Sequence, residues 1–271
     1  MVVTAKARHY SIKTGDRQKT YDFYIKYVGM TILRHEEFEE SCPAGLNGFK
    51  NDNKKWSKTI IGFGIEETNF VLEIIYNYNI KEIKHGNDFG GAYVKTNNGR
   101  LRNSNDPFGY PIFFERTSPT SFFHKIILYV KSLSKALEFW QKLLGMTIQS
   151  QNGESAILNY GNNQTSVELV ATKNEIIQES AAGRITFSIP ENQLVPLQES
   201  VKNYDKNLIQ KEITELKTPN KSAVRVVILT DPNGHEICFV GEEDFDRLAQ
   251  FDPNAQQLFI EAVKNENTET N

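Results

Sequence analysis

The stretch FYIKYVGMTIL, Phe23 to Leu33, returns 116 positions later as FWQKLLGMTIQ, Phe139 to Gln149. This spacing is too long for a solenoid repeat and predicts a duplicated domain. In both copies apolar residues recur at helical spacing, and a glycine, Gly29 or Gly145, stands where the helix should end. Ser134 is expected to cap the second helix at its start. The two halves of the chain should therefore share one scaffold.

Strand-like segments flank each predicted helix. RHYSIKT (8–14) precedes the first helix and HKIILYV (124–130) precedes the second, and further strand candidates follow each of them. A third unit of the same kind consists of GRITFSI (183–189), a helical stretch around Leu194 to Val201, and two strands joined by the turn DPNG (231–234). The repeating unit is therefore strand, helix and several strands, which predicts an α+β fold of tandem βαβββ modules.

Composition narrows the class of protein. The 271 residues carry a net charge of −3 with no long run of one sign, so a nucleic-acid partner is not expected. No apolar run approaches the roughly 18 residues needed to cross a bilayer, and no membrane contact is expected. The two cysteines, Cys42 and Cys238, are expected to be free thiols in a reducing compartment. The chain is predicted to be cytoplasmic.

The order of these features resembles a known superfamily. A strand carrying His9, a helix ending in a GM pair, a strand carrying Glu73 and a closing DPNG hairpin resemble the vicinal oxygen chelate (VOC) superfamily, whose members include glyoxalase I. Longer strings resemble one branch of it: RHEEFEE (34–40), KWSKT (55–59), YNYN (76–79), GNDF (86–89) and DPNGHEICFVGEEDF (231–245). The resemblance implies paired βαβββ modules that curl around a cleft, where four side chains hold a divalent ion and a carboxylate removes a carbon-bound proton.

On this basis we expect two glyoxalase/bleomycin-resistance-like (VOC) domains, residues 5–117 and 122–241, and a helical extension that frays at its end, residues 242–271. The second module of the first domain should be shortened. Only 24 positions separate Phe89 from Phe113, too few for a complete module, and they should form short strands without a helix. The first cleft would then be open, or covered by the tail and by an insertion at 36–54. The EEFEE run of this insertion is expected to be a solvated face or loop rather than a metal-binding site.

The resemblance assigns the catalytic roles to the first copy. His9 and Glu73 stand at the ligand positions of the first strand and the central strand, with Glu73 as base and His9 as ligand or acid. In the second copy the corresponding residues are Lys125 and Glu168. The copies therefore share a scaffold but not their chemistry, and catalysis is expected at His9 and Glu73.

Two pairings of the modules remain open. The remaining positions of the two clefts carry Phe89, Phe113, Arg184 and Cys238. If sequence neighbours pair, the His9–Glu73 pair lies beside two phenylalanines, and the second cleft is a salt-bridge cluster or an anion site around Lys125, Glu168 and Arg184. If the halves exchange modules, His9 and Glu73 meet Arg184 and Cys238, and the second-copy pair meets the phenylalanines.

A zinc or nickel ion on His9 and Glu73, with Cys238 as a third ligand, is one prediction from the exchanged pairing. Arg184 would have to turn away from such an ion, and an absence of tightly bound metal is the favoured prediction. Cys238 beside Arg184 is also a candidate nucleophile, against the simpler interpretation of a buried strand cysteine.

Two functions remain open. The first is a glyoxalase I-type (lactoylglutathione lyase-like) isomerase that acts on methylglyoxal or a related 2-oxoaldehyde thiol adduct, which would place the chain in methylglyoxal detoxification. The second is a non-catalytic module that binds a ligand or a protein partner. A monomer is expected, because the duplicated halves can supply what a homodimer supplies elsewhere. The resemblance brings a mitochondrial location as an alternative, although the N-terminus shows no presequence.

Overall fold

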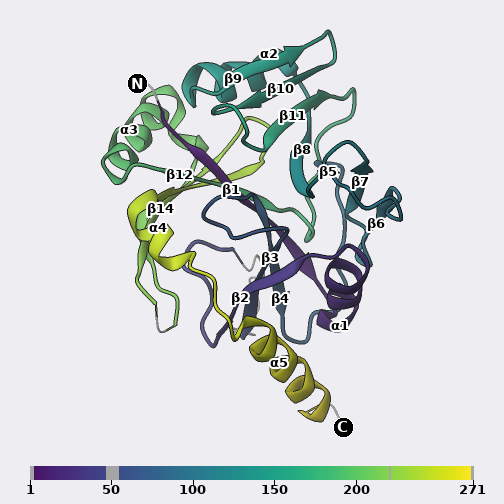
Figure 1. Ribbon diagram of the computed structural model, residues 1–271. Helices are drawn as coiled ribbons and strands as arrows, with labels where there is room; N and C mark the ends of the chain where they lie inside the picture. Colours follow the sequence, from purple (N-terminus) through teal and green to yellow (C-terminus); the bar gives the residue numbers. More distant parts are fainter. Residues whose placement is uncertain (1–2, 47–54, 220, 270–271) are drawn as a thin grey trace.

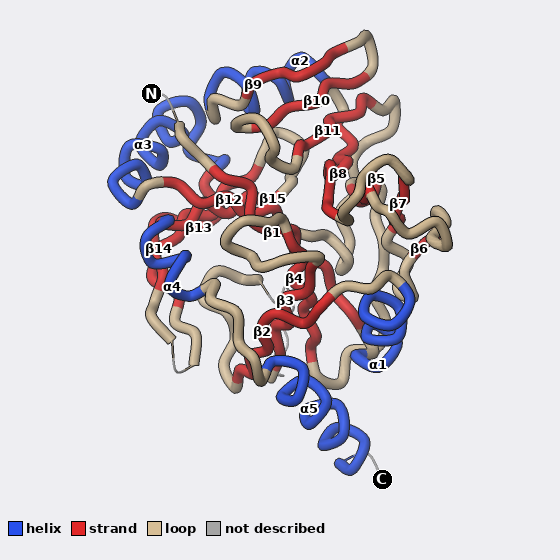
Figure 2. The backbone as a smooth tube through the Cα atoms, viewed as in Figure 1, coloured by secondary structure: helices blue, strands red, loops and turns tan. Residues whose placement is uncertain are grey.

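Two twisted β-sheets form the centre of the computed structural model, which describes residues 3–46, 55–219 and 221–269 (Figure 1). In this view the labelled helices stand at the periphery of the molecule (Figure 2). No helix in the described part of the chain is long and apolar enough to cross a membrane. The architecture is the α+β class that the tandem modules predicted.

The larger sheet combines strands from both ends of the chain. Its eight strands run in the order β13 (Ile209–Leu216), β14 (Val224–Thr230), β15 (Glu236–Gly241), β12 (Arg184–Ile189), β1 (Lys6–Thr14), β4 (Val71–Asn77), β3 (Trp56–Gly62) and β2 (Thr31–Phe38). The antiparallel pair β1 and β12 joins the first module to the last.

The smaller sheet is built in the same way from the two middle modules. Its seven strands run in the order β6 (Ser104–Asn105), β7 (Pro111–Glu115), β5 (Phe89–Lys95), β8 (Phe122–Val130), β11 (Ser166–Ala171), β10 (Ser155–Asn159) and β9 (Thr147–Gln151). The antiparallel pair β5 and β8 joins the halves. Of the two pairings that the sequence left open, the exchanged one is present, so the sheets do not coincide with residues 5–117 and 122–241. The shortened module is confirmed, because β5, β6 and β7 follow one another without a helix.

The repeated helices begin as α-helix and widen into π-helix. The first comprises α1 (Arg17–Thr20) and η1 (Tyr21–Tyr27), and the second comprises α2 (Leu133–Leu137) and η2 (Glu138–Leu143). Both stop before a glycine with positive φ, 86° at Gly29 and 77° at Gly145, as expected. The expected cap at Ser134 was wrong. Ser132 caps the second helix, because its backbone is extended and its side chain accepts from the Lys135 amide, whereas Ser134 already lies inside the helix.

The last module carries its own helical connection and leads into the C-terminal extension. The connection consists of η3 (Glu191–Gln193), α3 (Leu194–Asp205) and η4 (Lys206–Leu208). The extension contains α4 (Glu242–Leu248), which packs on the eight-stranded sheet, and α5 (Ala255–Glu269), which packs on β2. The extension was expected to fray at residues 266–271, but α5 continues to Glu269, and residues 270–271 fall outside the described residues.

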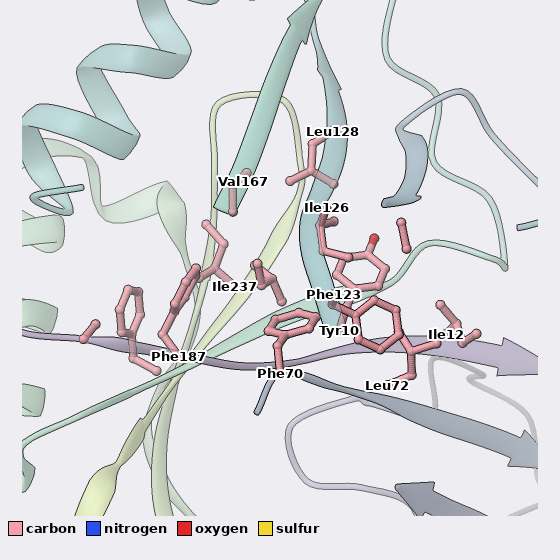
Figure 3. Packing of buried hydrophobic residues seen from close by; sticks show 14 of the residues in the cluster. Tyr10, Ile12, Phe70, Leu72, Phe123, Ile126, Leu128, Val167, Phe187 and Ile237 are labelled. Carbon is pink, nitrogen blue, oxygen red and sulfur yellow. The ribbon is translucent and has the colours of Figure 1, made fainter. Parts of the chain in front are cut away.

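The main hydrophobic core fills the space between the sheets (Figure 3). Tyr10 and Ile12 of β1 point toward Ile126 and Leu128 of β8, and all four side chains are at most 3% exposed. Burying such a side chain contributes about 1.5–3 kcal/mol. Because neighbouring strand residues alternate between faces, His9, Ser11 and Lys13 lie on the other face of the eight-stranded sheet. We call this surface the outer face.

One expectation about the insertion was wrong. The EEFEE run, residues 36–40, was expected to be a solvated face, but Glu36 and Glu37 belong to β2 and Glu36 is only 7% exposed. Glu39 and Glu40 are exposed. Strand alternation explains the difference, because Glu36 points to the outer face, where Arg34, Lys58 and Lys221 pair with it. The insertion's residues 47–54 lie outside the described residues.

Candidate active site

The adjacent strands β1 and β4 bring the two predicted catalytic residues together. Ser11 of β1 is paired in register with Glu73 of β4. His9, two residues before Ser11, lies on the same face of the sheet. The His9 Nε2 atom is 3.8 Å from the Glu73 carboxylate. His9 is 6% exposed and Glu73 is 3% exposed. The site is therefore an enclosed acid–base pair.

The exchanged pairing places the remaining predicted residues beside this pair. Arg184 of β12 is paired with Ser11, and Thr186 is paired with both His9 and Cys238. Arg184 and Cys238 are thus brought to the outer face with His9, as the exchanged alternative requires. Phe89 and Phe113 belong to the other sheet and are not part of this site.

A buried chain of ion pairs, which we call the relay, holds His9 through its Nδ1 atom. Arg34 of β2 donates through Nη2 to Glu66 Oε2 (2.6 Å) and through Nη1 to Glu36 Oε1 (3.1 Å). The second oxygen of Glu66 is 2.9 Å from His9 Nδ1. Burial alone would raise the pKa of Glu66, but Arg34 and His9 outweigh it and lower that pKa to about 2. Glu66 is therefore a fixed negative charge.

This fixed charge determines how His9 meets Glu73. An ionised carboxylate only accepts hydrogen bonds, so the His9 Nδ1–H group donates to Glu66. The Nε2 atom is left to face Glu73, where a proton can lie between them. The other Glu73 oxygen, Oε1, accepts a hydrogen bond from the Ser11 hydroxyl at 2.7 Å. The arrangement can therefore accept a proton at Glu73 and deliver one from His9.

The C-terminal extension and the insertion close this site. The ring of Phe245, on α4, lies 6.0 Å from the His9 ring, and the Ala44 carbonyl accepts from Arg184 at 2.8 Å. A pocket with a volume of about 200 Å³ lies beside the site. Ser11 and Arg184 line the cavity, together with loop residues around Gly45. His9 and Glu73 do not line this pocket themselves, and the Ser11 hydroxyl, which binds Glu73, connects the pair to it.

Arg184 is held in an ion pair, and Cys238 carries a buried thiol. The Arg184 guanidinium donates to Glu236 Oε2 from both Nη2 (2.6 Å) and Nε (2.9 Å). Burial raises the pKa of the Cys238 thiol to about 12, and the nearby Arg184 charge lowers it only in part. A thiol with this pKa is protonated at neutral pH, so the geometry does not support Cys238 as a nucleophile.

These residues do not fit a divalent ion. Of the four cleft positions, only His9 and Glu73 offer donors that are available near neutral pH, and structural zinc sites need four ligands. A dication about 4 Å from the Arg184 guanidinium would cost about 8 kcal/mol at an effective dielectric of about 20. Among residues 3–46, 55–219 and 221–269, no group of three or more His, Cys, Asp and Glu side chains could hold a metal ion.

The corresponding place in the seven-stranded sheet carries different chemistry. Lys125 and Glu168 form an ion pair at 2.6 Å, and the Lys125 ammonium lies 5.0 Å from the Tyr93 ring centre. Phe113 stacks on Tyr93 at 5.7 Å. Phe89 instead stacks on Tyr10 in the core at 4.9 Å, because a register shift at Phe89/Gly91 turns it away from this face. This second place is a closed ion pair under aromatic rings.

Sequence reasoning missed the relay residues Arg34, Glu66 and Glu36. Arg34 and Glu36 stand two positions apart in RHEEFEE, and a strand assignment would have placed them on one face. Glu66 lies in the loop between β3 and β4 and carries no sequence signal that distinguishes it from neighbouring Glu67. Only the folded loop brings it to His9.

The fold matches solved glyoxalase I structures. A glyoxalase I mutant from Zea mays aligns with a TM-score of 0.75 at 21% identity, over 91% of this chain and 95% of that chain. With the exchanged modules and the paired cleft positions, this similarity defines a protein of the vicinal oxygen chelate fold class.

Sequence comparison narrows the class. Residues 132–248 match the family model described as "Glyoxalase domain-containing protein 4-like, C-terminal domain". Glyoxalase domain-containing protein 4 of Rattus norvegicus is 39% identical, over 97% of this chain and 94% of that protein. Glyoxalase 1 of Caenorhabditis elegans is 37% identical, over 98% and 99%. The chain belongs to the glyoxalase domain-containing protein 4 family, and this membership supports a glyoxalase-like function.

Proposed function

We propose that the chain is a glyoxalase-type isomerase that converts a small 2-oxoaldehyde to the 2-hydroxy acid, with Glu73 as base and His9 as acid. The observation that carries this proposal is the position of Ser11, whose hydroxyl binds Glu73 at 2.7 Å and also lines the 200 Å³ cavity. A substrate in the cavity would contact the Ser11 hydroxyl, which in turn binds the carboxylate of the base, Glu73. The name Glyoxalase 1 of a 37% identical relative adds support.

The residues can supply a balanced proton transfer. In the hydrated aldehyde, Glu73 removes the proton on C1 while His9 protonates the neighbouring carbonyl oxygen, which gives an enediol. Glu73 then returns the proton to C2 while His9 takes back a proton from a hydroxyl on C1, which gives the 2-hydroxy acid with no atom lost or gained. Glu66 stabilises the protonated imidazole that the first step requires, since its carboxylate binds Nδ1. A positioned base of this kind contributes typically 10²–10⁴-fold to the rate.

The cavity size favours a substrate of few atoms, such as hydrated methylglyoxal. Pockets for drug-sized ligands occupy about 300–1,000 Å³, whereas this cavity measures about 200 Å³. A tripeptide thiol adduct would have to displace the segment 41–46, which places Ala44 over Arg184. The free aldehyde and the glutathione adduct are therefore the two substrates to compare.

The test is turnover of methylglyoxal, with and without glutathione, by the intact chain and two matched variants. We expect Glu73→Gln to lower kcat by about 10²-fold or more. Glu168→Gln, at the corresponding place in the other sheet, should keep the activity of the intact chain because Glu168 is paired with Lys125 away from the site. Equal activity in all three proteins would rule out the proposed site.

A non-catalytic binding module is the second candidate, and one observation favours it. His9, Glu73, Arg184 and Cys238 are all at most 6% exposed, and α4 and the insertion cover them. If the intact chain turns over neither substrate but binds lactate or methylglyoxal in a calorimetric titration, the binding function replaces the catalytic one.

A further inference from the structure

We infer that the pocket beside His9 and Glu73 is a carbonyl-capture site, in which the Lys13 amine condenses with the aldehyde carbon of a small 2-oxoaldehyde to form an imine. The inference concerns Lys13 and the pocket. It uses neither His9 nor Glu73 as a reacting group, so it does not depend on the proposed isomerisation.

The amine of Lys13 is held beside the pocket. Lys13 lies two residues after Ser11 on the outer face of β1, and both residues line the pocket of about 200 Å³. The Lys13 Nζ atom donates to the Ala182 carbonyl at 2.9 Å, and Ala182 lines the same pocket. A neutral amine can keep that hydrogen bond while its lone pair attacks a carbonyl carbon. A small aldehyde in the pocket would therefore meet a positioned nucleophile.

The surroundings of Lys13 favour the neutral form of its amine. Titratable groups face Lys13 from the neighbouring elements: Arg184 of β12, Glu236 of β15, Asp88 and Tyr110 of the loops before β5 and β7, Glu73 of β4 beside Ser11, and the exposed Glu179 of the pocket wall. Burial is the main cause that lowers the pKa of Lys13 from its ordinary 10.5 to about 8. Arg184 acts in the same direction, and Glu236 and Asp88 oppose it. Lysines that are desolvated or lie next to a second cation are those that form Schiff bases with carbonyl substrates.

The condensation needs no reagent other than the aldehyde. The Nζ lone pair forms a bond to the aldehyde carbon as the carbonyl π bond opens, and the two amine protons then leave with the oxygen as water. Water reverses the step, so the pocket can hold and release the aldehyde without an oxidant or a reductant. The second carbonyl of a 2-oxoaldehyde withdraws electrons from the aldehyde carbon, which favours this class over simple aldehydes.

The test is reductive trapping of the imine in the intact chain. Methylglyoxal is added with sodium cyanoborohydride, which reduces an imine to a stable amine, and the modified lysines are located by peptide mass spectrometry. Lys26 is the internal control, because its side chain is 62% exposed and the hydrogen bond that it donates to Asp22 raises its pKa. At pH 7 we expect Lys13 to be modified at least about tenfold faster than Lys26, since a pKa near 8 leaves more than about a hundredfold more neutral amine.

The pH profile identifies the reacting group. Modification of Lys13 should rise with pH and level off above about pH 8, because its amine is then mostly neutral. Modification of Lys26 should still be rising at pH 9, because its pKa is raised. In concentrated urea the folded pocket is lost, and the two lysines should react at similar rates.

Two outcomes would overturn the inference: a folded chain in which Lys13 reacts no faster than Lys26, or a Lys13 rate that urea leaves unchanged. Both measurements use the intact chain, so neither depends on the folding of a variant. Lys13→Met should lose the fast phase of trapping, and the matched variant Lys26→Met should keep it. Trapping at Lys13 without turnover of methylglyoxal would support this inference and contradict the proposed isomerase, whereas turnover without trapping would do the reverse.

Discussion

Glu66 shows how one loop residue determines the state of the site. Its carboxylate is held between Arg34 and His9, at 2.6 Å and 2.9 Å, in surroundings that exclude water. Burial of an isolated carboxylate would favour its neutral form, and only the two partners reverse that preference. Because Glu66 stays ionised, His9 keeps its Nδ1 proton on that side and presents Nε2 to Glu73.

The lowered pKa of Glu66 predicts a dependence of stability on pH. The folded-state pKa is about 2, below the ordinary value of 4.5, so the contribution of Glu66 is complete above pH 4.5 and is lost as the pH falls toward 2. Glu66→Gln should lower the free energy of unfolding at pH 7 by about 3 kcal/mol. Urea unfolding from pH 7 to pH 2 should show that difference narrowing below about pH 5.

The control is Glu67→Gln, which changes the neighbouring, partly exposed carboxylate. It should alter stability little at any pH. A difference between the intact chain and Glu66→Gln that stays constant from pH 7 to pH 2 would show that Glu66 is not ionised as described.

The strand β2 links the site to the C-terminal extension. Arg34 and Glu36 project to the outer face and join the relay, while His35 projects to the other side. There the ring of Phe259, on α5, lies 5.4 Å from His35 and 5.8 Å from Tyr21. The Arg17 guanidinium also donates to the Ala262 carbonyl of α5 at 2.9 Å. The helix α5 is therefore a packed part of the fold.

Truncation of Phe259 should measure how strongly α5 is packed. Phe259 is 4% exposed, and Phe→Ala changes in cores cost about 3–5 kcal/mol. Phe259→Ala should therefore lower the free energy of urea unfolding by about 3 kcal/mol. The adjacent Leu258→Ala, at a position that is 40% exposed, should cost less than about 1 kcal/mol. Equal costs for the two substitutions would indicate that α5 does not dock as described.

At the scale of the whole molecule, neither half of the sequence contains a complete sheet. The eight-stranded sheet needs β1–β4 from one half and β12–β15 from the other, and the seven-stranded sheet is divided in the same way. Separated halves would expose the paired edges of β1, β12, β5 and β8. The repeated modules are therefore units of sequence and of local structure, but the sheets are shared.

Fragments test this sharing directly. Residues 1–118 and 119–271, expressed separately, should each lack a cooperative unfolding transition, because the central strand pairs and part of the core between the sheets are missing. An equimolar mixture should co-elute and recover the transition, as followed by circular dichroism. Cooperative unfolding of fragment 1–118 alone, at the midpoint of the intact chain, would contradict the prediction.

Much of the scaffold could be predicted from local pattern. The helices that end at Gly29 and Gly145, the hairpin at Asp231–Gly234 and the shortened module between Phe89 and Phe113 all depend on residues close together in the chain. The cap at Ser132 was missed because two serines stood near the start of the helix, and only the backbone conformation distinguishes them.

The sequence alone determined the modules, their order and the residue types at His9 and Glu73, because strand and helix periodicity and turn chemistry act over a few residues. Which modules share a sheet was decided by the tertiary structure, since a pairing between β1 and β12 leaves no local mark. The same holds for the relay. Arg34, Glu66 and His9 come from three separate segments, and their charges become strongly coupled only after folding removes the water between them.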